Sequence, residues 1–96
     1  MAASRRRVDF TKRAATEYLK GLLYIATQDL SAATLVQDRI EVALTLLPQQ
    51  PHIGRPGIVP GTREFPVRKT SYTIVYRVRA RAIQVLRVLH QRRRYP

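Results

Sequence analysis

The chain has 96 residues, no cysteine and a hydrophobic fraction of 45 %, which fit one globular domain and exclude disulfide frameworks and thiolate metal sites. Its 18 Lys and Arg residues against 6 Asp and Glu residues give a formal net charge of +12, which favours a polyanion or an acidic protein surface as partner. His52 and His90 lack companion ligands, so we expect no metal and no cofactor. No apolar run approaches the roughly 20 residues of a membrane span, and no apolar segment follows the N-terminal arginines. We therefore expect no membrane span, no signal peptide and a cytoplasmic location.

The first half of the chain predicts a short strand and two helices. Residues 5–10 alternate apolar and polar side chains as a strand does, and Thr11 is a suitable N-cap for the helix that follows. The apolar residues of this first helix recur at three- and four-residue spacing and predict one buried stripe: Ala14, Ala15, Tyr18, Leu19, Leu22, Ile25 and Ala26. We expect Ser31 to cap a second helix and Pro48 to end it. The short link between the helices predicts an antiparallel hairpin.

The composition changes abruptly over residues 48–61, which contain four prolines and three glycines. Neither a helix nor a central strand tolerates this density, so the segment is predicted to be a surface loop. Loops of this length in small domains are often functional, and a plain linker is the alternative.

The remaining chain predicts three strands, at residues 62–67, 72–78 and 82–90. In the last two strands both alternating sets of side chains contain apolar residues, so the sheet needs cover on both faces. The helical hairpin covers one face, and we expect the other to be a groove or a partner-binding surface.

These elements predict an α+β fold for a single domain, residues 1–96. It comprises the N-terminal strand, the antiparallel helical hairpin at about 11–47, the Pro/Gly loop at 48–61, a three-stranded antiparallel sheet at 62–90 that packs on the hairpin, and a basic tail at 91–96.

The positive charge is concentrated in the second half of the chain. Residues 55–96 hold eleven Lys and Arg against a single acid, Glu64. An arginine in a central strand is costly to bury alone, so it points to an open face, extends to the rim or meets a carboxylate. An ion pair between Glu64 and one arginine is therefore a structural alternative to binding. The candidates for binding a target or a nucleic acid are Arg55, Arg63, Arg77, Arg87, His90, Arg92, Arg93 and Arg94.

Few residues of the chain are candidates for a catalytic role. Metal-free RNA cleavage needs a base, an acid and cations that stabilise the charged phosphorane, and the candidates are Arg63, Arg77, Arg87, His90 and Tyr95. A single histidine at a strand end is more often structural, so spacing alone assigns no catalytic residue.

Four segments in this order carry a family resemblance: Gly54-Arg-Pro-Gly57, Gly61-Thr-Arg-Glu64, Ser71-Tyr-Thr-Ile-Val-Tyr-Arg-Val78 and Leu86-Arg-Val-Leu-His-Gln-Arg92. The chain resembles the RelE/ParE superfamily of toxins from bacterial type II toxin-antitoxin systems. The resemblance implies a small sheet packed on a helical hairpin and growth arrest by the free toxin. It also implies a cognate antitoxin, acidic where it meets this chain, that forms a neutralising complex.

The superfamily contains two mechanisms. RelE-like members cut messenger RNA on the ribosome, and ParE-like members poison DNA gyrase without a known catalytic site. RelE-like nucleases typically carry an arginine where this chain has Thr73, whereas the Val-Leu-His-Gln-Arg ending is similar to that of many ParE-like chains. The resemblance thus favours a gyrase inhibitor that is not an enzyme. A ribosome-dependent endoribonuclease and, outside the toxin class, a harmless nucleic-acid-binding domain stay open.

Overall fold

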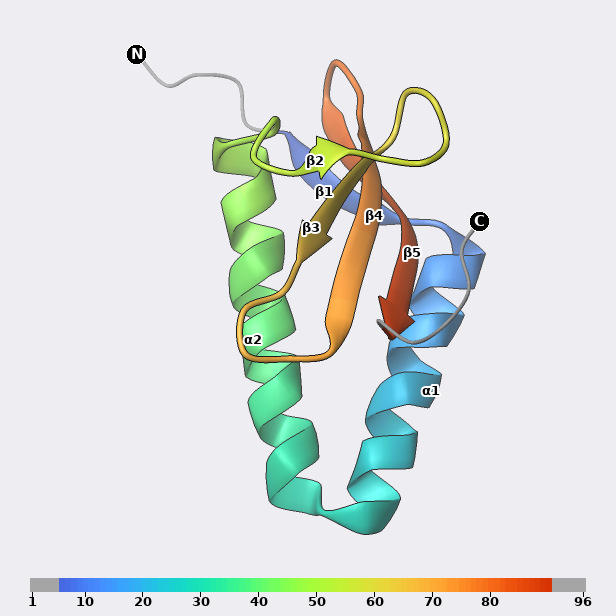
Figure 1. Ribbon diagram of the computed structural model, residues 1–96, viewed down its shortest axis with the longest axis vertical. Helices are drawn as coiled ribbons and strands as arrows, with labels where there is room; N and C mark the ends of the chain where they lie inside the picture. The colour runs from blue at the N-terminus through green and yellow to red at the C-terminus, as the bar shows by residue number, and fades with distance from the viewer. Residues whose placement is uncertain (1–5, 91–96) are drawn as a thin grey trace.

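Five strands form one mixed sheet that packs on two antiparallel helices in the computed structural model, which describes residues 6–90 (Figure 1). The elements in chain order are β1 (Arg7–Phe10), α1 (Lys12–Gln28), α2 (Leu30–Gln49), β2 (Arg55–Pro56), β3 (Arg63–Pro66), β4 (Tyr72–Val78) and β5 (Ala82–His90). The strands lie in the order β1-β5-β4-β3-β2, with β1 parallel to β5 and the other pairs antiparallel. The predicted α+β class is confirmed.

The predicted count of three sheet strands is wrong, because one short strand joins each edge. β1 lies parallel to β5, with Val8 opposite Ile83, so the N-terminal strand is part of the same sheet. At the other edge β2 pairs with β3 over two residues, with Pro56 opposite Arg63. An edge strand tolerates proline because its outer side needs no backbone donor, so the Pro/Gly-rich loop can supply a strand there.

The helix ends follow local hydrogen bonding, with two departures from the prediction. Thr11 caps α1 as predicted and accepts from the backbone N–H of Ala14. Asp29, not Ser31, caps α2, and its own N–H closes the last turn of α1, so one residue links the helices. Pro48 does not end α2 but lies within its last turn, and the helix ends one residue later. The helix tolerates this proline because, so close to the C-terminus, it removes only one helical hydrogen bond.

The core lies between the helical hairpin and one face of the sheet. Its buried members are Ala14, Ile40, Ala43, Leu44, Leu47, Val67, Ile74, Tyr76, Ile83, Val85 and Val88. Val75 and Leu89, on the alternating set that faces away from this core, are only 1 % and 5 % exposed. Among residues 6–90, no large apolar side chain on a strand is exposed. Large exposed apolar side chains lie on the helices and the loop instead: Leu19, Leu23, Tyr24, Leu30, Leu35, Val42, Ile53 and Ile58.

The Pro/Gly loop is anchored to the core by Tyr76. Its hydroxyl donates to the carbonyl of Pro51 (2.8 Å) and accepts from the N–H of Gly54 (3.0 Å), while the side chain is fully buried. A Cβ at position 54 would lie 2.7 Å from this hydroxyl oxygen, so only glycine fits there. Figure 1 shows the loop and β2 crossing in front of β3 and β4.

Replacing Tyr76 by phenylalanine tests this anchor. Tyr76→Phe keeps the ring but leaves the buried N–H of Gly54 and the partly buried carbonyl of Pro51 without this partner, so the free energy of unfolding should fall by about 1–3 kcal/mol. Urea unfolding measures the loss, and amide hydrogen exchange at Gly54 should accelerate. Tyr24→Phe, at a side chain that is 68 % exposed, is the matched control and should change stability by less than about 0.5 kcal/mol. Unchanged stability and exchange in Tyr76→Phe would show that the loop is held by other contacts.

Candidate functional site

Arg63 is committed to the loop. It lies on β3 opposite Tyr76, so its side chain shares the face of that residue. One guanidinium nitrogen, Nη1, donates to the carbonyls of Gly54 (2.6 Å) and His52 (3.3 Å). Arg63 therefore helps to fix the loop, and binding a phosphate there would compete with these hydrogen bonds.

The single acid of the sheet half forms the predicted structural ion pair. Arg55 on β2 lies opposite Glu64 on β3, with 3.2 Å between Nη2 and Oε1. The second carboxylate oxygen of Glu64 accepts from the N–H of Ile58. Glu64 is 8 % exposed, so it links β2 to the loop from a buried position.

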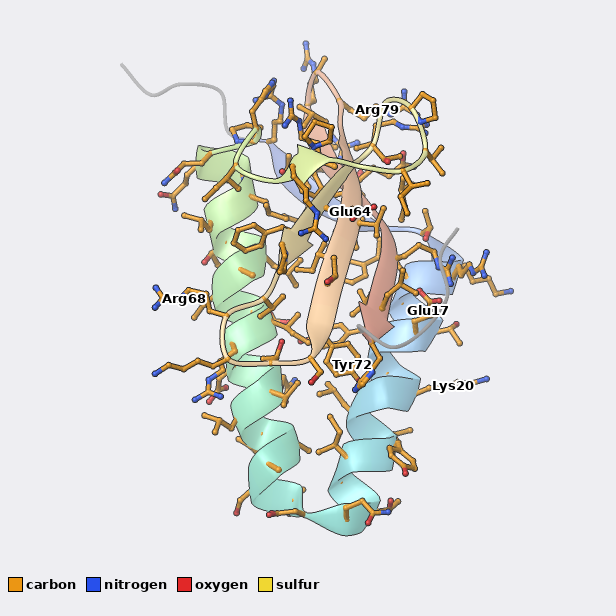
Figure 2. The ribbon with its side chains drawn as sticks, in the orientation of Figure 1. Glu17, Lys20, Glu64, Arg68, Tyr72 and Arg79 are labelled. Atoms are coloured by element: carbon orange, nitrogen blue, oxygen red, sulfur yellow. The ribbon has the colours of Figure 1, made fainter. Side chains whose placement is uncertain are left out.

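Arg87 on β5 meets a carboxylate that comes from the other half of the chain. Its guanidinium donates to Glu17 on α1 through Nη2 (2.6 Å) and Nε (2.9 Å), and both side chains are about one-tenth exposed. Glu17 also accepts from the backbone N–H of Val88 (3.1 Å). Figure 2 shows Glu17 on α1 beside β5. The guanidinium of Arg87 is thus used within the fold.

The pKa of Glu17 reflects this environment. Burial alone would raise it, but the hydrogen bonds from Arg87 and Val88 and the charges of Arg87 and Arg13 outweigh burial, so the pKa lies below its usual value. Sequence reasoning placed no function on Glu17. The available signal was its position three residues after Ala14, on the same face of α1 as that buried side chain.

Arg77 and His90 lie apart from Arg63. Arg77 follows Tyr76 on β4, so it faces the side of the sheet opposite to Arg63. His90 lies at the end of β5 opposite Tyr72, and the two rings meet edge to face with centroids 5.5 Å apart. The structure does not bring the predicted catalytic cations together on one surface. Tyr95, Arg92, Arg93 and Arg94 lie outside the described residues.

Metal and membrane sites are likewise not found in the described part of the chain. Residues 6–90 contain no group of three or more His, Asp or Glu side chains placed to hold a metal ion. Within the same range, neither helix combines the length and apolarity that crossing a bilayer requires.

An apolar cleft opens where β1 meets the two helices. Its volume is about 450 Å³, and its apolar lining includes Val8, Phe10, Ala15, Tyr18, Leu19 and Leu44. The rings of Phe10 and Tyr18 stack with centroids 6.0 Å apart, and the Tyr18 hydroxyl donates to Glu41 (2.7 Å). Burial and the neighbouring carboxylate raise the pKa of Tyr18, which keeps it neutral. The cleft is a preformed apolar surface with a polar rim.

Sequence reasoning placed Leu19 in the buried stripe of the first helix, but the structure leaves it 59 % exposed at this cleft. The sequence feature that indicated this exposure was the width of the apolar stripe. Consecutive apolar pairs at 14–15, 18–19 and 25–26 make a band wider than one packing partner covers.

Comparisons with known proteins agree with this architecture. A family model described as "ParE toxin of type II toxin-antitoxin system, parDE" matches residues 8–95. The chain is 36 % identical over 93 residues to "Putative toxin Y4kP" of Sinorhizobium fredii (strain NBRC 101917 / NGR234), covering 97 % of this chain and 96 % of that protein. A chain from the solved structure "Chromosomal ParDE TA system from P. aeruginosa" is similar in fold, with a TM-score of 0.79, 23 % identity, and coverage of 92 % of this chain and 98 % of that one.

The Glu17–Arg87 pair predicts a defined pH dependence of stability. Because folding lowers the pKa of Glu17, its carboxylate stabilises the fold above the unfolded value of about 4.3, and this is lost as the pH falls through the lower folded value. Glu17→Gln removes the negative charge beside Arg87 at every pH, so the variant should lose about 3 kcal/mol at pH 7. The difference from the native protein should narrow in acid, where the native carboxyl becomes protonated.

Urea unfolding between about pH 3 and pH 7 measures this difference. Asp38→Asn removes an exposed carboxylate elsewhere on the helical hairpin and should stay within about 0.5 kcal/mol of the native protein. A pH-independent loss in Glu17→Gln would contradict the assignment of the stabilisation to the ionised carboxylate.

Proposed function

Because the chain belongs to the ParE toxin family of type II toxin-antitoxin systems, we propose that the free protein arrests bacterial growth by inhibiting DNA gyrase in the cytoplasm. The observation that carries this choice over RNA cleavage is the use of two of the three candidate sheet arginines within the fold. Arg63 is bonded to loop carbonyls and Arg87 to Glu17. Thr73 adds to the argument, since it stands where RelE-like nucleases typically place an arginine.

The cognate antitoxin neutralises the toxin by docking on the apolar cleft between β1 and the helical hairpin. Leu19 at its edge and Leu23 one turn further along α1 are 59 % and 58 % exposed, which gives an amphipathic helix or extended segment an apolar surface to bury. The net charge of +12 favours an antitoxin segment that is acidic around its apolar contacts. The toxin and the antitoxin together form a hetero-oligomer.

Ribosome-dependent cleavage of messenger RNA is the second candidate within the family fold. Its support is His90, which is exposed at the end of β5 and contacts the ring of Tyr72. A proton-transferring histidine in such a place would still need cations beside the cleaved phosphate, and the candidates Arg63 and Arg87 are hydrogen-bonded within the fold. Outside the toxin class, a harmless nucleic-acid-binding domain would bind polyanions in a salt-sensitive manner and leave a bacterial host growing.

Two assays on one preparation decide between these mechanisms. The purified protein at micromolar concentration should block supercoiling by gyrase or trap cleaved DNA, while primer extension on transcripts from arrested cells should show no new ends. His90→Ala serves as a control because it removes the exposed histidine that a nuclease would use for proton transfer. Cleaved transcripts that disappear in His90→Ala, with normal supercoiling, would replace gyrase inhibition by RNA cleavage. Normal growth of cells that make soluble protein would refute both toxin mechanisms.

Charge placed in the cleft tests the antitoxin surface. Leu19→Glu should weaken binding of the acidic protein encoded beside the toxin gene by at least tenfold, because it buries a carboxylate against an apolar and acidic partner. Leu30→Glu is the matched control, since Leu30 is 71 % exposed at the tip of the hairpin and does not line the cleft. Titration calorimetry measures both affinities. In cells, Leu19→Glu should stay toxic when the antitoxin is co-expressed, and equal effects of the two variants would place the contact elsewhere.

A further inference from the structure

A second, larger hollow lies on a different side of α1 from the apolar cleft. This groove has a volume of about 1020 Å³ and lies between α1 and the ends of β4 and β5 where Tyr72 and His90 face each other. Lys12, Arg13 and Lys20 contribute cationic side chains to its lining. None of these three residues was among the binding candidates predicted from the sequence, which came from the sheet half and the tail.

The electrostatics of the groove favour an anion. Glu17 supplies the acidic side chain among the described lining residues, and its charge is already balanced by Arg87, with 2.6 Å between Nη2 and Oε2. The cations of α1 therefore exceed the available carboxylates. One end of the groove lies at the first turn of α1, where the helix dipole adds to the positive potential.

Aromatic rings line the same groove. Tyr24 is 68 % exposed, and Tyr72 and His90 meet edge to face. Gly21 lets the Tyr72 ring approach the helix, because a Cβ at that position would lie 2.7 Å from the hydroxyl oxygen. The glycine that costs helix stability thus makes room for the aromatic floor of the groove.

The exposed residues of α1 along the groove form a row. Lys12, Thr16, Lys20 and Tyr24 recur every four residues, so they follow one ridge that winds slowly around the helix over about 18 Å beside the groove. Cation, hydroxyl, cation and aromatic ring follow one another along this row. Cations beside rings are the combination that binds a polynucleotide strand with unpaired bases, since phosphates take the charges and bases stack on the rings.

We propose that this groove is a binding site for single-stranded nucleic acid, with backbone phosphates on Lys12, Arg13 and Lys20 and a base stacked on Tyr24. An acidic peptide would use the cations but would give the exposed aromatic ring no partner, so the nucleic acid is favoured. The inference does not depend on gyrase inhibition. The nucleic acid would bind to the toxin in the absence of gyrase, so failure of the gyrase assay would leave this proposal unaffected.

Fluorescence anisotropy with labelled oligothymidylate and oligouridylate of about 12 nucleotides tests the site on the full chain. The double variant Lys12→Gln/Lys20→Gln should weaken binding at least tenfold and reduce the slope of log affinity against log salt by about 1.4, as expected for two lost phosphate contacts on a single strand. The matched control is Arg68→Gln/Arg81→Gln, which removes the same charge from exposed positions outside the groove. Figure 2 shows Arg68 and Lys20 on opposite sides of the molecule. The control should lose less than threefold.

Tyr24 separates stacking from charge. Tyr24→Leu should weaken binding about fivefold or more, and Tyr24→Phe should retain it, because only the ring provides the stacking surface. Circular dichroism should be unchanged, given the exposure of this side chain.

Three outcomes would overturn the proposal. Equal losses in the groove and control double variants would mean that general surface charge binds the strand. Unchanged binding in Tyr24→Leu would remove the stacking contact. Displacement of the oligonucleotide by an equimolar polyglutamate peptide would assign the groove to an acidic protein segment. Binding in either nucleic-acid arm that depends on the groove residues supports the site, and a preference for oligouridylate would identify RNA through its 2′-hydroxyl groups.

Discussion

The join between α1 and the edge of β5 is the constraint on which the arrangement depends. β1 pairs with β5 only as far as Val85, and the rest of that edge would be left with unpaired backbone groups. Thr11 takes over where β1 ends, donating to the carbonyls of Val85 and Leu86 through its N–H and its hydroxyl. Glu17 then accepts from Val88 and Arg87. Thr11 and Glu17 thereby satisfy backbone groups of β5 that a further strand would otherwise pair with. These hydrogen bonds fix α1 against the sheet.

This join also limits what the sheet arginines can do. A buried ion pair contributes little net stability compared with apolar packing, but losing one partner is expensive, so Arg87 is held in place by Glu17. Arg63 is held in the same way by two loop carbonyls. These two candidate cations of a nuclease site are therefore part of the scaffold. The positive charge available to a partner therefore comes from exposed positions, among them the row along α1.

The sequence predicted local features well and long-range features poorly. The bounds of β4 and β5 agree with the predicted strands at 72–78 and 82–90, because β-branched and aromatic residues between polar turns specify them locally. The parallel pairing of β1 joins segments more than 70 residues apart, and no local pattern specifies a partner at that distance. The same limit hid Glu17 as the partner of Arg87. Leu19 and Lys20 carried a local signal, but their neighbours along the helix do not reveal which face meets the sheet.

The three faces of α1 explain how one short helix serves fold and partners together. Ala14 faces the core, Ala15 and Leu19 face the apolar cleft, and Thr16 and Lys20 face the basic groove. Glu17 and Gly21 lie between the sheet and this groove. Successive residues turn by about 100°, so neighbouring positions such as 19 and 20 belong to different surfaces. An antitoxin segment in the cleft and an anionic strand in the groove would contact separate faces of the helix. Any coupling between the two sites would pass through the shared anchor of α1 on β5.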